Sequence, residues 1–85
     1  IGWAYYLIGD YIKAEQTLKK AVEKMPRDPV VNDHYGDILW MLNRKIEANY
    51  FWKNVLSFDD TDIKIKNDIK YKLLKGPKKH LKYEL

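Results

Sequence analysis

The side chains of this sequence that are able to carry out catalysis or bind a metal are few, and they do not form a recognisable set. The two histidines, His34 and His80, stand alone, without ligand spacing to a cysteine or to each other. The single serine, Ser57, has no histidine near it in sequence to act as its base. We therefore expect no enzymatic activity, no metal site and no cofactor.

Two pairs of acidic residues are the remaining candidates for chemistry. Asp33 and Asp37 are four residues apart, and the second pair is Asp59-Asp60 in the segment SFDD. We interpret the first pair as a solvated helix face and the second as a helix cap, in preference to a general acid and base. The glycines fall at packing or turn positions, and none belongs to a phosphate-binding loop; they are Gly2, Gly9, Gly36 and Gly76.

The length and composition indicate one small domain, or a piece of a larger one, with a basic end. Hydrophobic residues make up 46% of the 85 residues and aromatic residues 14%, which is enough for a packed core. No apolar run approaches the roughly 18–20 residues that a membrane-spanning helix needs. The formal net charge of +4 comes from residues 62–85, which carry +5, while residues 1–61 carry −1. Cysteine is absent, which fits either the cytoplasm or a bacterial periplasm.

The sequence repeats itself with a period of 34 residues. Ala14 corresponds to Ala48, and Leu18 corresponds to Trp52. A third, weaker copy aligns Val31, Tyr35 and Leu39 with Ile65, Ile69 and Leu73. The return of small or large apolar residues at one fixed period indicates a repeat architecture.

Each repeat has the hydrophobic spacing of two helices. Pro29, with Asp28 as its cap, begins a helix whose apolar residues recur at intervals of three and four. A turn at Asn43-Arg44 separates it from a second helix. Asp60-Thr61 is expected to cap a last helix from about residue 62 to residue 74, which Gly76-Pro77 ends. No segment alternates with period two, so the predicted fold class is all-α.

In this pattern the chain resembles the tetratricopeptide repeat (TPR), a 34-residue helix-turn-helix unit. The first unit supplies the family's positions as Ile1-Gly2, Tyr5, Gly9, Tyr11, Ala14, Leu18, Ala21 and Pro26, and the second as Tyr35-Gly36, Leu39, Ala48, Trp52 and Val55. The resemblance covers about residues 1–75. It departs from the family where Asn32 replaces the early tryptophan of the second unit. The chain also looks like the last repeats of larger bacterial TPR proteins.

The resemblance implies an α-solenoid of TPR units with a C-terminal capping helix. Residues 1–28 would form an N-terminally incomplete unit, 29–61 a second unit, 62–75 the capping helix and 76–85 a flexible basic tail. Small residues are expected where helices approach closely, namely Gly2, Gly36, Ala14, Ala48 and Ala21. In the capping helix we expect apolar Ile65, Ile69 and Leu73 on the inner side and Lys64, Lys66, Lys70 and Lys72 on the polar side.

The resemblance also implies a non-catalytic scaffold that binds a peptide segment or partner helix in a concave groove. The residues expected to bind are Trp3, Tyr6, Asp33, His34, Asp37 and Trp40, with Leu7, Val30 and Met41 on the same side. The acids argue against a clamp for a chaperone-tail carboxylate and favour a basic or neutral segment. For Trp40 and Met41 the alternative is packing against the adjoining helix.

Three other interpretations stay open. The lysine-rich last helix and tail offer a surface for nucleic acid or another polyanion. The open side of the first helix, which begins halfway at Ile1, is expected to meet a missing upstream repeat or a second copy of the chain. The basic tail is either solvated or docks in the acidic groove.

Overall fold

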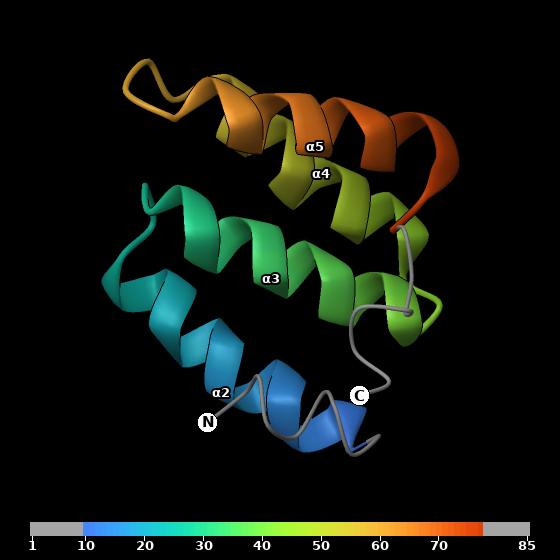
Figure 1. Cartoon of the computed structure of the whole chain (residues 1–85). Helices are drawn as coiled ribbons and strands as arrows, with labels where there is room; N and C mark the ends of the chain where they lie inside the picture. The colour runs from blue at the N-terminus through green and yellow to red at the C-terminus, as the bar shows by residue number, and fades with distance from the viewer. Residues whose placement is uncertain (1–9, 78–85) are drawn as a thin grey trace.

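The described part of the chain, residues 10–77 of a computed structural model, is all-helical and contains no strand. Its helices are α2 (Tyr11–Lys24), α3 (Pro29–Met41), α4 (Lys45–Leu56) and α5 (Ile63–Lys75). Each helix packs against the next one in sequence, α2 on α3, α3 on α4 and α4 on α5. The chain reverses direction at every turn (Figure 1), as short connections between neighbouring helices require.

Aspartate side chains fix the starts of three helices. Asp28 Oδ1 accepts hydrogen bonds from the backbone N–H groups of Val30 and Val31 at 2.9 and 3.0 Å, as the sequence predicts for the start of α3. The cap of α5 differs from the expected Asp60-Thr61. Asp62 caps this helix, because its own backbone is extended and its Oδ1 reaches the N–H of Lys64 at 2.7 Å. Asp10 caps α2, where its Oδ1 accepts a hydrogen bond from the N–H of Lys13 at 3.2 Å.

The turn between α3 and α4 confirms the prediction at Asn43-Arg44. Asn43 has a φ of 64°, in the left-handed region that asparagine tolerates better than most residues. The N–H of Arg44 donates to the carbonyl of Leu39, and the N–H of Asn43 donates to that of Trp40, both at 2.9 Å. These two bonds form a Schellman motif, which ends α3 and allows α4 to fold back immediately.

The core lies between α3, α4 and α5. Its main cluster consists of Tyr35, Leu39, Ala48, Trp52, Val55, Phe58 and Ile69, and a smaller cluster joins Ala14 of α2 to Ile38 of α3. Ala14 and Ala48 are fully buried, and Gly36 lies directly against the ring of Trp52, so the expected close approaches are confirmed at these positions. Ala21 is half-buried and borders a hollow on α2.

Asn32 of α3 is buried, and its side chain is hydrogen-bonded to the backbone. Its Nδ2 donates to the carbonyl oxygens of Pro26 and Asp28 at 3.1 and 2.8 Å. The side chain thus ties the α2–α3 turn to the first turn of α3. A buried amide whose donor group is hydrogen-bonded to the backbone thus holds this turn in place.

Candidate functional site

The most concentrated group of charged side chains joins α5 to α3. Lys72 of α5 reaches across so that its Nζ donates to Asp33 Oδ1 at 2.7 Å and to Asp37 Oδ1 at 2.9 Å. Asp68, one turn earlier on α5, places Oδ2 3.7 Å from the same Nζ. Asp33 and Asp37 are four residues apart on α3, which brings both carboxylates to one face.

This cluster is buried, which corrects two expectations from the sequence. Lys72 is 5% exposed and Asp37 is 1% exposed, so Asp33–Asp37 is not a solvated pair and Lys72 does not belong to the outer, polar side of α5. Lys72 is buried because of its position on α5. Lys72 follows the fully buried Ile69 by three residues and lies 34 residues after Ile38, itself a core residue. Both the spacing from Ile69 and the spacing from Ile38 indicate that Lys72 lies on the buried side of α5.

The charges of the cluster depend on one another. Burial alone would lower the pKa of Lys72, but the attraction of Asp37 and Asp33 outweighs it and raises this pKa above its ordinary value. Burial and the neighbouring charge of Asp37 raise the pKa of Asp33, although Lys72 and His34 act in the opposite direction. Removal of the ammonium would therefore leave two carboxylates in a poorly solvated place.

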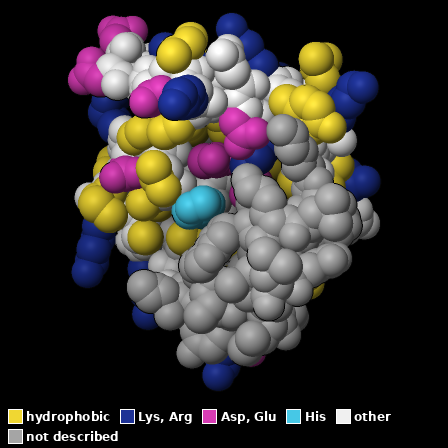
Figure 2. All heavy atoms as spheres, in the orientation of Figure 1, with side chains coloured by type: hydrophobic (Ala, Val, Ile, Leu, Met, Phe, Trp, Pro, Cys, Tyr) yellow, Lys and Arg dark blue, Asp and Glu magenta, His cyan; other side chains and the backbone are white. Residues whose placement is uncertain are grey.

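An exposed stripe of α3 lies beside the cluster. Val30, His34 and Met41 follow one another at intervals of four and seven residues, so they share a helix face. Val30 is 47% exposed, Met41 is 36% exposed and the side chain of His34 is 34% exposed. His34 Nδ1 lies 4.0 Å from Asp37 Oδ2. In Figure 2, acidic, histidine and hydrophobic side chains gather on this face of the molecule.

Trp40 packs against residues of α4 and the end of α5. Its ring lies 5.6 Å from that of Trp52, and Lys45 Nζ lies 4.8 Å from the Trp40 ring centroid. The backbone of Gly76 lies against its other edge. These contacts give Trp40 a packing role at the end of α5. Trp3 and Tyr6, the other aromatic residues expected in the groove, lie outside the described residues.

Gly76 ends α5 in a conformation that suits glycine alone. Its φ of 81° and ψ of 176° lie in a region that side chains disfavour, and an added Cβ would lie 2.9 Å from Trp40 Cζ2. We expect Gly76→Ala to lower the free energy of unfolding by about 1–3 kcal/mol, measured by urea titration. Lys75→Ala, at the exposed neighbouring position, is the control. Equal stability of the two variants would contradict this account of the turn.

The second buried link between helices joins Tyr35 of α3 to Glu15 of α2. Tyr35 Oη donates to Glu15 Oε2 at 2.8 Å, and Arg44 Nη1 lies 3.8 Å from the same oxygen. Burial first, and then the hydrogen bond and charge of Glu15, raise the pKa of Tyr35 above its ordinary value. The phenol therefore keeps its proton more tightly in the folded chain than in the unfolded chain.

This tighter hold on protons predicts a loss of stability in alkaline solution. Both Lys72 and Tyr35 have folded-state pKa values above their ordinary values of about 10, so above that pH the unfolded chain binds fewer protons than the folded chain. The free energy of unfolding is expected to fall steadily from about pH 10 upward, in thermal melts monitored by circular dichroism. Tyr35→Phe should make this fall shallower. A flat profile up to pH 11.5 would contradict the prediction.

Comparisons of the chain with protein-family models, with curated proteins and with solved structures find no match. Within residues 10–77, no helix has the length and apolar character to cross a membrane. In the same residues, no three or more His, Cys, Asp or Glu side chains are grouped so that they could hold a metal ion. The geometry of the α3 face is therefore the main basis for a functional proposal.

Proposed function

We propose that this chain is a non-catalytic, protein-binding scaffold of the TPR type, which binds a peptide segment or partner helix on the exposed stripe of α3. The observation that carries the proposal is the stripe itself, where Val30, His34 and Met41 remain accessible on one face beside a buried ion cluster. Exposed methionine is typical of binding surfaces, because its flexible side chain adapts to the shape of a partner.

The 34-residue period supports the solenoid part of the proposal. Two pairs of residues at this separation have matching environments, since Ala14 and Ala48 are both fully buried, and so are Tyr35 and Ile69 to within a few per cent. A repeated unit that buries the same positions and packs each helix on the next is what a stacked array requires.

The ion cluster limits the chemistry of the partner. Lys72 already binds Asp33 and Asp37, so the partner need not supply a cation to satisfy them. Asp68 is a third carboxylate beside a single ammonium, and its side chain is 33% exposed. The face therefore keeps an excess of negative charge. It should accept a neutral or basic segment whose apolar side chains contact Val30 and Met41.

The test compares the wild-type chain with the double variant Val30→Ser/Met41→Gln as bait in a nuclease-treated lysate, with mass spectrometry of the retained proteins. Substitution of Trp40 is avoided because it would also remove contacts with Trp52. The matched control is Ile46→Ser/Leu74→Gln, since these residues are 86% and 83% exposed on α4 and α5.

We expect a protein that the wild type and the control retain and that the α3 variant loses. If all three baits retain the same proteins, or none retains any, the exposed stripe of α3 is not a binding surface and the proposal is wrong. Circular dichroism of each bait establishes that all three are equally helical.

A further inference from the structure

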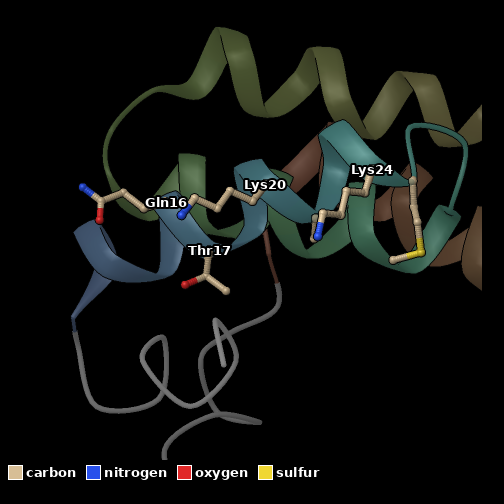
Figure 3. Close-up of a pocket in the computed structure, with 6 residues that line it drawn as sticks. Gln16, Thr17, Lys20 and Lys24 are labelled. Atoms are coloured by element: carbon tan, nitrogen blue, oxygen red, sulfur yellow. The ribbon is translucent and has the colours of Figure 1, made fainter.

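A second feature of the surface is a hollow on α2. It has a volume of about 540 Å³ and is lined by Gln16, Thr17, Lys20, Ala21, Lys24 and Met25. Figure 3 shows Gln16, Lys20 and Lys24 in a row along α2, with Thr17 beside them. The lining residues form two parallel rows, because each member follows the previous one by four residues. One row consists of Gln16, Lys20 and Lys24, and the other consists of Thr17, Ala21 and Met25.

The row with the two lysines points away from the packed side of α2. Leu18 and Val22 pack against the core. Lys20 and Lys24 follow them by two positions, which is about 200° around the helix axis, and both lysines are exposed. The lysines therefore project from the side of α2 opposite to Leu18 and Val22.

The charge on this side of α2 is predominantly positive. Lys19, Lys20 and Lys24 are exposed, and Glu23 is the single exposed acid of this helix. Glu15, the other acid of α2, faces inward and binds Tyr35. A lysine-rich helix surface often serves only for solubility. Here the small side chain of Ala21, between Thr17 and Met25, leaves an open space next to the cationic row.

We propose that this face of α2 binds an acidic, amphipathic helix of a partner protein. Lys20 and Lys24 are one turn apart, so they match two carboxylates that are also one turn apart on a partner helix. An apolar side chain between those carboxylates would enter the hollow over Ala21 and contact Met25. The surface shares no residue with the exposed stripe of α3, so this proposal and the proposed function fail independently.

The experiment measures binding of a defined probe to the full 85-residue chain by fluorescence anisotropy. The probe is a fluorescein-labelled, alanine-based helical peptide that carries pairs of glutamates four residues apart with a leucine between them. We expect saturable binding by the wild type. Lys20→Glu/Lys24→Glu should weaken binding at least about tenfold, because it turns two attractions into repulsions.

Matched controls separate a docking site from general attraction between opposite charges. Lys53→Glu/Lys64→Glu makes the same change in net charge on exposed positions of α4 and α5, and it should weaken binding less than about twofold. Ala21→Leu, which fills the hollow and leaves the charge unchanged, should also weaken binding. A probe with alanine in place of leucine should bind more weakly than the original.

Four outcomes would overturn the proposal. These are the absence of saturable binding, equal weakening by the two double variants, equal binding of the probe that lacks leucine, and displacement of the probe by single-stranded DNA of equal charge as effectively as by unlabelled peptide. The last outcome would assign the face to polyanions in general. Dimerisation of the wild type that Lys20→Glu/Lys24→Glu abolishes, seen by sedimentation, would assign it instead to a second copy of the chain.

Discussion

Lys72→Met will lower the free energy of unfolding by about 3–5 kcal/mol, because it leaves the carboxylates of Asp33 and Asp37 buried without their cation. Methionine keeps much of the volume of the lysine side chain, so the loss measures charge more than packing. Small domains have a total free energy of unfolding of about 5–15 kcal/mol. The loss is therefore expected to be a large fraction of the stability of the chain.

Circular dichroism during urea titration measures this effect. Lys70→Met removes an exposed lysine from the same helix and should change the stability by less than about 0.5 kcal/mol. A triple variant that adds Asp33→Asn and Asp37→Asn to Lys72→Met should recover much of the loss, because no uncompensated charge remains buried. If Lys72→Met is as stable as the wild type, the cluster is not buried in solution.

The same cluster shows where prediction from the sequence succeeds and where it fails. Helical spacing correctly brings Asp33 and Asp37 to one face, because that follows from the geometry of a single helix. Their burial depends on a lysine that is supplied by another helix, 35 residues later for Asp37. Residue type alone places a lysine at the surface. The repeat places Lys72 in the core, because it corresponds to the buried Ile38.

Local signals predict the boundaries of the helices well. Asp28 with Pro29 begins α3, and Asn43 ends it, because a cap and a left-handed turn need only neighbouring residues. The sequence predicts Asp60-Thr61 as the cap of α5, but residues 59–62 are three acids and a threonine, and each of these residue types is able to cap a helix. The conformation of the chain around Asp62 selects among them.

The aromatic part of the expected groove is less predictable. The sequence alone allows Trp40 either to bind a partner or to pack, and its contacts with Trp52 and Gly76 are those of a packed residue. Sequence spacing does not reveal the contact with Gly76, because Gly76 lies 36 residues after Trp40 in the sequence and the two meet only in the folded chain. The role of the α3 face in binding stays a prediction.

Gly36→Ala will destabilise the chain by about 2 kcal/mol, although alanine favours a helix more than glycine does. A Cβ at this position would lie 2.5 Å from Trp52 Cδ1 and closer still to Nε1. Trp52 is fully buried, so its ring cannot move into solvent. Overpacking of this kind costs up to about 3 kcal/mol, and the gain in helix propensity offsets about 1 kcal/mol of it.

A double-mutant cycle tests whether the clash with Trp52 is the cause. In a Trp52→Phe background the smaller ring lacks Nε1, so Gly36→Ala should cost less than it does in the wild type, by at least about 1 kcal/mol. Equal costs in both backgrounds would exclude the clash. The ring of Trp52, which Gly36 contacts, is also bonded to the candidate binding face, because Trp52 Nε1 donates to the carbonyl of Asp33 at 3.2 Å. Movement of the ring should therefore shift Asp33 relative to Lys72, and the loss of stability caused by Gly36→Ala should not add independently to that of Lys72→Met.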